Sequence, residues 1–580
     1  MATVTINGQE IQIADDQKLN VVQAAKQMGV EIPTYCWHPA LSVVASCRMC
    51  LVELGEKGPD GQVTMQPRLA PACQMPARDG LVVVTNSPKA KQAQAATLEY
   101  LLLNHPLDCP TCDQAGECYL QDYSYRFGRG HSRLQEPKEQ KPDKDYIGDE
   151  ITLFTDRCIM CTRCVRFTRE ISGTAELQVI NRGTRAEIDI YPGEPCNNKL
   201  AGNVVDICPV GALCSKDFLY EQRVWWLRSR NSVCPDCSTG CSIHVNQNNE
   251  TIYRLRPRSN PQAQGDFMCD EGRFGWKYIH DPQRHTHPVV KLPGVASSAP
   301  SRPAAARPGT NGAVANEVIL PPDWSGILAQ VRDKIVEQVK QNAGGVAAIF
   351  SPWMTVEEAY LLAHWLKGLS PDVQLAMGPV PVVGEDDHYP KDAHGQGVMP
   401  PKFTIHAEKC PNRRGVERVL AHFQPEVTPF DAILDAAQGG RLAAAYVVHP
   451  GPTGWLAEDQ ISTLGKVPFL IVQDLIQSPL SDSAHVVLPG AAFAEKDGTF
   501  INHKELAQAI VRAIRCPAEG YTDSRIFMEL AGRSGMFNAR LLRREIGERI
   551  PEFAPLGDGE LGEYGVSLVA SQASQEVTAS

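Results

Sequence analysis

The sequence predicts a multidomain protein that combines α+β and α/β folds. Its 580 residues suit about three to five domains. All but two of its 19 cysteines precede residue 270. After a segment rich in Pro, Ala and Ser, the pattern changes to helical stretches that alternate with short apolar runs. The two halves of the chain are therefore expected to differ in architecture.

The first residues predict a β-hairpin followed by a helix. Apolar and polar residues alternate on either side of an Asn7-Gly8 turn, as in a two-residue hairpin. A helical pattern over 19–28 follows and stops at Gly29. Other small α+β folds begin in this way, but the order is that of a β-grasp ferredoxin, which we expect over 1–90.

The remaining elements are predicted from composition. A run rich in Ala, Gln, Glu and Leu at 91–103 predicts a helix that stops near Pro106. The polar stretch 130–147 predicts a surface connection, and 294–316 predicts a linker. The last ten residues are predicted to be disordered. An α/β domain with a largely parallel sheet is expected after the linker, with strands at 347–350, 444–448, 469–472 and 486–489.

Bulk composition argues against several classes of protein. The net charge of -11 disfavours nucleic-acid binding. No apolar run approaches the ~18 residues that span a bilayer, and the N-terminus does not resemble a signal peptide. We therefore expect a reducing, cytosolic compartment, where disulfides are rare and so many cysteines point to metal ligation.

The first cysteine group has the spacing C-x10-C-x2-C-x22-C. Four thiolates can hold a [2Fe–2S] cluster, and the ten-residue first gap marks a variant of the plant-type pattern. A structural zinc site also uses C-x2-C, but the β-grasp start in front of this group favours iron and sulfide. The members of the group are Cys36, Cys47, Cys50 and Cys73.

The second group reads H-x3-C-x2-C-x5-C. Three cysteines at this spacing need a fourth ligand, and the histidine is the near candidate. A neutral imidazole in place of a thiolate removes a negative charge and shifts the reduction potential upward. A zinc site with three cysteines and one histidine remains an alternative. The group comprises His105, Cys109, Cys112 and Cys118.

The third group combines a C-x2-C-x2-C triplet with a distant Cys-Pro. The triplet suits three corners of a cubane, and bacterial ferredoxins complete such a cluster from a distant segment. Cys196 and Cys214 compete for the fourth position, and the Cys-Pro context favours Cys208. The predicted ligands are Cys158, Cys161, Cys164 and Cys208.

Four arginines surround this triplet. Positive charge at these positions would favour a reduced cluster. The alternative is that at least two of the arginines only solvate a helix face. They are Arg157, Arg163, Arg166 and Arg169.

The fourth group, with the spacing C-x2-C-x3-C-x27-C, is ambiguous between a [4Fe–4S] cluster and a zinc ribbon. Its neighbours in the chain favour iron–sulfur. Its members are Cys234, Cys237, Cys241 and Cys269, whereas the unassigned cysteines, expected to be ordinary buried residues, are Cys196, Cys214, Cys410 and Cys516.

These four groups, in this order, resemble the large iron–sulfur subunit of the NADH-quinone oxidoreductase of respiratory complex I, called the G subunit in bacteria and the 75 kDa subunit in mitochondria. The resemblance covers residues 1 to about 290. It rests on Tyr35-Cys-Trp-His-Pro39, Cys47-Arg-Met-Cys50, His105-Pro-Leu-Asp-Cys-Pro-Thr-Cys-Asp-Gln-Ala-Gly-Glu-Cys118 and Cys158-Ile-Met-Cys-Thr-Arg-Cys164.

The resemblance implies a [2Fe–2S] cluster on the first group and [4Fe–4S] clusters on the other three, with His105 as a ligand; the cluster on the fourth group is the least certain. The implied domains are a [2Fe–2S] ferredoxin domain at 1–90, a [4Fe–4S] domain with one histidine and three cysteine ligands at 91–135, a [4Fe–4S] ferredoxin-like domain at 136–226, a molybdopterin-oxidoreductase-type cluster domain at 227–293, a linker at 294–316, a degenerate molybdopterin-oxidoreductase-like domain at 317–570 and a tail at 571–580.

The C-terminal half is similar to molybdopterin oxidoreductases at 487–502. It is about half as long as their catalytic domains, and Cys410 is a poor candidate for a metal ligand. We therefore expect a truncated, non-catalytic scaffold without molybdopterin.

The chain has no P-loop, and its G-x-G-x-x-G string at 557–562 does not follow a predicted strand, so no nucleotide site is signalled. The resemblance implies an electron relay in a proton-translocating NADH:quinone oxidoreductase, with no catalytic acid, base or nucleophile in this chain. Electrons would enter at the first group, continue through the third and second, and leave toward quinone, with the fourth group off this route.

The implied partners are an FMN- and NADH-binding subunit, a 24 kDa-type [2Fe–2S] subunit and further iron–sulfur subunits of the peripheral arm. Membrane contact would occur only through these partners, on the cytoplasmic side of the inner membrane. Alternatives are the diaphorase part of an NAD-reducing hydrogenase, a molybdopterin-dependent formate dehydrogenase, and a zinc-stabilised scaffold. An iron-only hydrogenase would need more cysteines after residue 300.

Overall fold

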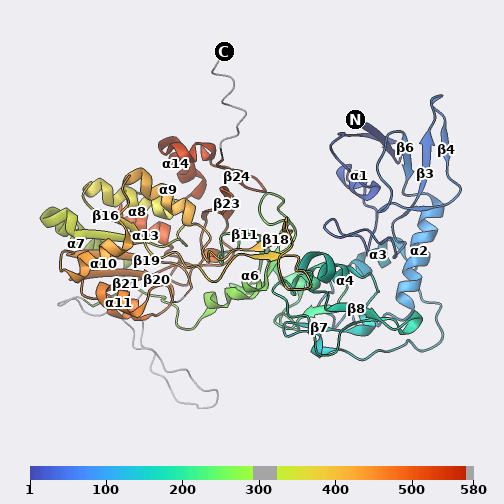
Figure 1. Ribbon diagram of the computed structural model, residues 1–580, viewed down its shortest axis with the longest axis horizontal. Helices are drawn as coiled ribbons and strands as arrows, with labels where there is room; N and C mark the ends of the chain where they lie inside the picture. Colours follow the sequence, from blue (N-terminus) through green and yellow to red (C-terminus); the bar gives the residue numbers. More distant parts are fainter. Residues whose placement is uncertain (292–322, 453, 570–580) are drawn as a thin grey trace. The chain divides into compact units, whose positions relative to one another are not determined.

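The computed structural model describes residues 1–291, 323–452 and 454–569 (Figure 1). Contacts divide the chain into two compact units: residues 1–227 with 388–403, and the rest. The boundary between the units therefore falls at 227/228, ahead of the predicted linker. That linker and the predicted disordered tail lie outside the described residues.

The first unit opens with a mixed sheet in the order β2-β1-β6-β3-β4. The predicted hairpin is confirmed, because β1 and β2 pair across Asn7 and Gly8, both of which have positive φ. β1 runs parallel to β6, and helix α1 buries one face against the sheet in a shared apolar core. The elements are β1 (Ala2–Ile6), β2 (Gln9–Ile13), α1 (Val21–Gln27), β3 (Leu51–Lys57), β4 (Val63–Met65), β5 (Ala70–Pro71) and β6 (Leu81–Val84).

The predicted second helix begins three residues early. Helix α2 (Pro88–Leu103) starts where the Ser87 side chain accepts a hydrogen bond from the Ala90 amide at 3.1 Å. Proline at the first helical position suits this start because its missing N–H has no partner to lose. The helix ends at Leu103, before Pro106, as predicted.

The rest of the first unit consists of short elements that carry the cysteine loops. The predicted surface connection 130–147 is mostly exposed, but it buries Lys144, whose Nζ lies 2.6 Å from Asp189. The elements are α3 (Tyr119–Phe127), β7 (Ile151–Leu153), α4 (Arg163–Phe167), β8 (Leu177–Ile180), β9 (Glu187–Ile190), α5 (Asn203–Ile207) and β10 (Leu213–Ser215). The strand pair β17 (Asp387–Tyr389) and β18 (Phe403–Ile405) encloses the segment 388–403.

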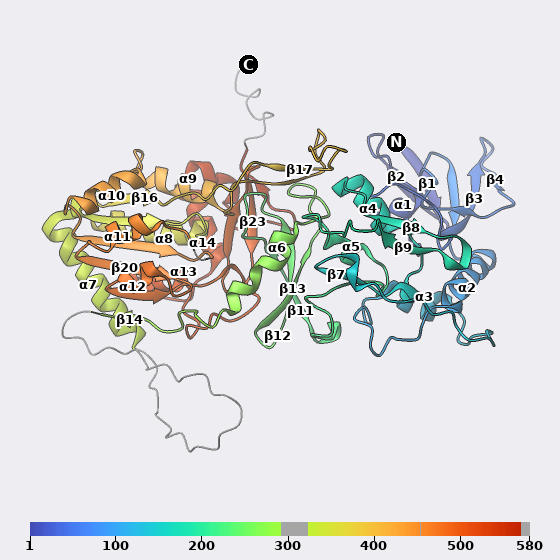
Figure 2. The same ribbon diagram turned by 60° about the horizontal axis from the view of Figure 1, so that its bottom comes forward.

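The second unit begins with an antiparallel sheet of three strands, which lie side by side in Figure 2. Helix α6 (Asp270–Phe274) follows this sheet. The strands are β11 (Arg228–Val233), β12 (Ser242–Asn248) and β13 (Thr251–Pro257).

A larger sheet forms the centre of the second unit, in the order β14-β21-β20-β19-β15-β16. It is parallel except for β14, which agrees with the predicted α/β domain. Alternate residues of β15 and β19 enter two different apolar cores, so both faces of the sheet are covered. The strands are β14 (Val289–Val290), β15 (Val346–Phe350), β16 (Gln374–Met377), β19 (Ala444–His449), β20 (Phe469–Asp474) and β21 (Val486–Pro489).

The remaining described elements pack around this sheet or follow it. They are α7 (Trp324–Asn342), α8 (Val356–Leu369), α9 (Arg413–Phe423), α10 (Phe430–Gln438), α11 (Glu458–Leu464), α12 (Pro479–Ser483), β22 (Gly498–Ile501), β23 (Leu506–Ile510), α13 (Asp523–Leu530), α14 (Ala539–Arg549) and β24 (Val566–Ser567). Within the described residues, no helix combines the length and apolarity needed to cross a membrane.

Candidate metal centres

The four cysteines of the first group lie together beside β3. The Cys36 sulfur contacts Cys47 and Cys73, and Cys73 also contacts Cys50. Hydrogen bonds from Cys47 and Cys73 lower the pKa of Cys36, and a hydrogen bond from Cys73 lowers the pKa of Cys50. The loops from α1 to β3 and from β5 to β6 therefore gather the predicted ligands, although the members lie up to 37 residues apart in the chain.

The cysteine loops contain left-handed residues that are not glycine. Arg48 lies between Cys47 and Cys50 with φ 60°, while Met160 and Thr162, inside the third group, have φ 51° and 60°. Such backbone is costly for residues with a Cβ and persists where surrounding contacts require it. Here it occurs in the tight turns between cysteines that lie three residues apart in the chain.

The third group lines a single cavity. Cys158, Cys161, Cys164 and Cys208 all contribute to its wall, whereas Cys196 and Cys214 do not. Burial raises the pKa of Cys158 to about 12 and that of Cys161 to about 11, and the nearby Arg163 and Arg166 oppose the rise at Cys161. The geometry therefore favours Cys208 as the fourth member.

Three of the four arginines near this group are buried, which corrects the expectation that at least two only solvate a helix face. Arg157, Arg163 and Arg166 are 5%, 6% and 8% exposed, and only Arg169 is exposed to solvent. Arg157 forms an ion pair with Asp108 at 3.0 Å, and its guanidinium packs over the Phe154 ring. Arg163 instead donates to main-chain carbonyls at 2.6 and 3.1 Å.

The cysteines of the second group lie in the loop between α2 and α3. Amides of this loop donate to the Asp108 carbonyl at 2.8 Å, and Cys118 caps α3. Burial raises the pKa of Cys118 to about 12, with Cys112 and Cys109 adding to the rise because their charges repel a thiolate at Cys118. The three cysteines thus lie within electrostatic reach of one another.

His105 differs from these cysteines in its surroundings. Its Nδ1 is buried without a hydrogen-bond partner, and its ring lines a cavity that Cys158 also lines. Burial lowers the pKa of His105 to about 4, with Lys138 and Arg157 as the next largest influences. The imidazole is therefore neutral at pH 7, the form in which histidine binds metals. The structure thus leaves Nδ1 of His105 buried and unpartnered, as a metal ligand would be. It shows no contact that assigns this nitrogen to the second group.

The four cysteines of the fourth group are all buried, with 3 to 6% exposed. A Cβ on Gly272 would lie 2.7 Å from the Cys234 sulfur and 3.7 Å from the Cys269 sulfur. Asp236 lies 3.8 Å from the Cys234 sulfur, and burial raises the pKa of this carboxyl to about 7. The glycine thus leaves the space into which two of the sulfurs point.

The β22–β23 hairpin holds the loop between Cys237 and Cys241. Asn502 donates to the Thr239 carbonyl at 3.1 Å, and Gln508 donates to the Gly240 carbonyl at 2.8 Å. Both side chains are buried. No local pattern in the sequence marks these contacts, because their partners lie 263 and 268 residues apart.

The residues present fit iron–sulfur clusters on three counts. Buried thiols lie together in sets, glycines leave room beside the sulfurs, and a neutral histidine presents an unpartnered nitrogen. In the part of the chain that the structure describes, no three His, Cys, Asp or Glu side chains are arranged to hold a single metal ion. Cysteines that hold a cluster bind different irons and need not converge on one point.

Five family models match the chain in the predicted order. They are a 2Fe-2S iron-sulfur cluster binding domain at residues 1–88, the NADH-ubiquinone oxidoreductase-G iron-sulfur binding region at 94–133, the ferredoxin-like domain of NADH-quinone oxidoreductase subunit 3 at 148–214, the molybdopterin oxidoreductase Fe4S4 domain at 227–281 and molybdopterin oxidoreductase at 436–533.

Curated relatives also carry the names of NADH-quinone oxidoreductase subunits. The G subunit of the NADH-quinone oxidoreductase of Rickettsia felis is 35% identical over 64% of this chain and 49% of its own length. The NADH-ubiquinone oxidoreductase 75 kDa subunit of Reclinomonas americana is 38% identical over 51% of this chain and 41% of its own. The resemblance to the large iron–sulfur subunit is confirmed.

The predicted fold class is confirmed with it, because ferredoxin-type and molybdopterin-oxidoreductase-type domains follow one another as expected. The chain spans about half the length of the curated bacterial relatives it matches. A solved structure of an NAD+-reducing [NiFe]-hydrogenase is 28% identical, with 38% of this chain and 91% of that chain covered and a TM-score of 0.33.

Proposed function

We propose that this chain is an electron-carrying iron–sulfur subunit of an NADH:quinone oxidoreductase. The observation that carries the proposal is that separate sets of buried cysteines occur on domains whose order matches the large iron–sulfur subunit. The curated relatives carry the names of NADH-quinone oxidoreductase subunits. The same residue sets suit one-electron carriers, a role that needs no acid, base or nucleophile.

The proposed cofactors are one [2Fe–2S] and three [4Fe–4S] clusters. Bound clusters would supply one-electron redox chemistry at potentials set by their surroundings. The ligands would be Cys36, Cys47, Cys50 and Cys73 for the first; His105, Cys109, Cys112 and Cys118 for the second; Cys158, Cys161, Cys164 and Cys208 for the third; and Cys234, Cys237, Cys241 and Cys269 for the fourth.

The protein's own residues would act by position and charge. Most of the proposed ligands are buried, which keeps water from the sulfurs. Buried arginines place positive charge beside the third group, while Asp236 and the ion pair of Lys409 with Glu271 at 2.6 Å lie near the fourth. This difference in charge supports different roles for the two groups, with the fourth off the main route.

We also propose the assembly in which the chain works. An FMN- and NADH-binding subunit, a 24 kDa-type [2Fe–2S] subunit and further iron–sulfur subunits of a peripheral arm would be its neighbours. The chain would lie on the cytoplasmic side of the inner membrane and reach the membrane only through them. The domain at 317–570 would serve as a scaffold without molybdopterin.

Anaerobic purification followed by Fe, S, Zn and Mo analysis and EPR spectroscopy tests the proposal. If all four clusters are bound, each chain should contain roughly 14 iron atoms, and reduction should produce four distinct EPR signals. Cys50→Ser, Cys112→Ser, Cys161→Ser and Cys237→Ser should each weaken one signal and spare the others. A colourless, zinc-rich protein that is silent after dithionite reduction would overturn the proposal, and about one Mo per chain would favour a molybdenum enzyme.

A further inference from the structure

Two buried arginines of α4 connect the backbone of the first cysteine group to that of the third. Nη2 of Arg166 donates to the Cys36 carbonyl at 2.5 Å and to the Cys161 carbonyl at 3.2 Å. One nitrogen thus contacts a member of each group. Its other terminal nitrogen, Nη1, donates to the Ser42 carbonyl at 2.5 Å, in the same loop as Cys36.

Arg163 repeats this arrangement one turn earlier in the helix. It donates to the carbonyl of Trp37, directly after Cys36, at 2.6 Å, and to the carbonyl of Ile207, directly before Cys208, at 3.1 Å. Its side chain also lines the cavity of the third group. Both guanidiniums therefore lie between loops that belong to the two groups.

Neither guanidinium forms an ion pair with an acidic side chain of the described residues. Among the described residues, the ion pairs include no carboxylate partner for Arg163 or Arg166. Glu170, the acidic residue nearest to them in the sequence, accepts hydrogen bonds from the amide and hydroxyl of Ser42 instead. A buried cation without a carboxylate partner is costly even where main-chain carbonyls accept its hydrogen bonds, so the arrangement calls for negative charge nearby.

We propose that Arg163 and Arg166 form a shared cationic bridge whose charge raises the reduction potentials of the clusters on the Cys36 and Cys158 groups together. This inference rests on the proposed function, since it needs both clusters. Uptake of one electron makes a cluster more negative by one charge. A fixed positive charge stabilises that state, and burial limits the screening by solvent and salt.

The chain offers a matched control on the same stretch. Arg169 lies three residues after Arg166 and is exposed. Replacing it removes the same formal charge from a position where water screens it. Arg166→Gln, Arg163→Gln and Arg169→Gln thus compare the loss of one charge at two buried positions and one exposed position, with an amide donor left at each.

Potentiometric EPR titration of the full chain with its clusters measures the effect. Arg166→Gln should lower the equilibrium constant for reduction of each of the two clusters by on the order of tenfold. For a one-electron couple this is a reduction potential lower by about 59 mV. Arg163→Gln should do the same, with the larger effect on the third group, whose cavity it lines. Arg169→Gln should leave both potentials unchanged.

Arg166→Lys separates charge from hydrogen bonding. It keeps the positive charge but cannot span the three carbonyls as a guanidinium does. Its potentials should therefore stay near those of the wild type even where its thermal stability falls, and it keeps the comparison possible if Arg166→Gln fails to fold.

Two results would overturn the cationic bridge while leaving the proposed function intact. One is that Arg166→Lys and Arg166→Gln shift the reduction potentials equally. The other is that Arg166→Gln shifts neither potential although both clusters are present. Absence of clusters from the wild-type chain would instead overturn the proposed function itself.

Discussion

At the residue scale, Gly211 determines how closely two cysteine loops approach. A Cβ at this position would lie 2.2 Å from the Cys112 sulfur, while the glycine itself follows Cys208 by three residues. Gly211→Ala should therefore displace Cys112 and remove most of the EPR signal of the second group. Gly130→Ala, at a site where a Cβ meets nothing within 4 Å, is the control. If Gly211→Ala keeps the full EPR signal of the second group, the loop that contains Cys112 can shift without losing its cluster.

His105 carries a second prediction at this scale. If it is a ligand, His105→Cys replaces a neutral imidazole with a thiolate, and the added negative charge should lower the potential of that cluster by on the order of 100 mV. Potentiometric EPR measures the change. His131→Cys alters an exposed histidine of the same unit and should have no effect. An unchanged potential with the cluster intact would assign the fourth ligand to another residue.

Spacing indicated most of the cysteines, because ligands within a short loop leave a local pattern, and the Cys-Pro context indicated Cys208. It could not indicate Arg163 or Arg166 as a bridge, since their partners Cys36 and Trp37 lie more than 120 residues away. The local sequence pattern also gave no sign of Gly211, whose role depends on a sulfur from another loop. Residues that act across the fold are visible only when the fold is known.

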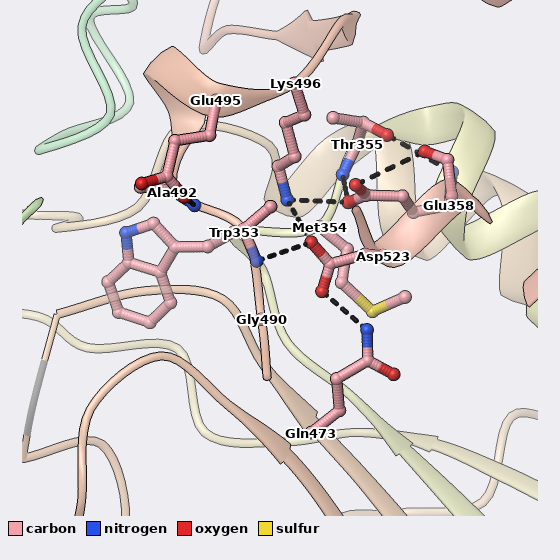
Figure 3. A network of polar contacts seen from close by, with 12 residues as sticks. Trp353, Met354, Thr355, Glu358, Gln473, Gly490, Ala492, Glu495, Lys496 and Asp523 are labelled. Atoms are coloured by element: carbon pink, nitrogen blue, oxygen red, sulfur yellow. Dashed lines mark hydrogen bonds and ion pairs between the residues drawn. The ribbon is translucent and has the colours of Figure 1, made fainter. Parts of the chain in front are cut away.

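At the scale of elements, a buried polar network joins α8, α13 and the segment before β22 (Figure 3). Lys496 contacts Glu358 at 3.0 Å and Asp523 at 3.3 Å, and all three side chains are almost fully buried. Asp523 also accepts hydrogen bonds from Gln473 at 2.7 Å and from the Ala491 amide at 2.9 Å. Two acids therefore face one cation, so a proton on one of them completes the charge balance.

This network makes the second unit sensitive to pH. Burial raises the pKa of Glu358 from its usual 4.5 to about 7, with Lys496 opposing the rise. The folded state thus holds this proton more tightly than the unfolded chain, and the stability it adds is complete below pH 4.5 and lost as pH rises through about 7. The free energy of local opening should therefore fall as pH rises over this window.

Hydrogen exchange of peptides covering 490–502, corrected for intrinsic rates at pH 5 to 8, measures this opening. Glu358→Gln has no carboxyl to titrate and should flatten the dependence. Glu337→Gln, on the exposed face of α7, should keep the wild-type slope. A slope that survives in Glu358→Gln would assign the titration to another group.

The elements themselves were largely predictable. Strands β15, β19, β20 and β21 each contain the apolar run that predicted them. The exact ends of helices and strands were harder to predict, as the Ser87 cap of α2 shows. They depend on caps and strand pairings that are set by the three-dimensional context. The β22–β23 hairpin was not predicted, because the family-like stretch 487–502 covers β22 but ends before β23. Its contact with the Cys237 loop has no signature in the chain.

At the scale of the whole molecule, the chain passes between its two units three times, at 227/228, 387/388 and 403/404. The segment 388–403 belongs to the first unit although the chain on either side of it belongs to the second. Sequence reasoning placed this segment in the C-terminal domain because composition does not change there. Its assignment to the first unit arises from backbone contacts with the residues that follow α4.

Gly173 is the residue on which this contact depends. The Lys391 amide donates to the Ser172 carbonyl at 2.8 Å, and a Cβ on Gly173 would lie 2.1 Å from the Lys391 carbonyl oxygen. Gly173→Ala should therefore detach the segment and accelerate tryptic cleavage after Lys391 and Lys402 severalfold. Gly183 also has positive φ but nothing within 4 Å of a Cβ, so Gly183→Ala has the same backbone cost without the clash. Equal cleavage rates in the two variants would mean that backbone strain, rather than the contact, controls how the segment is held.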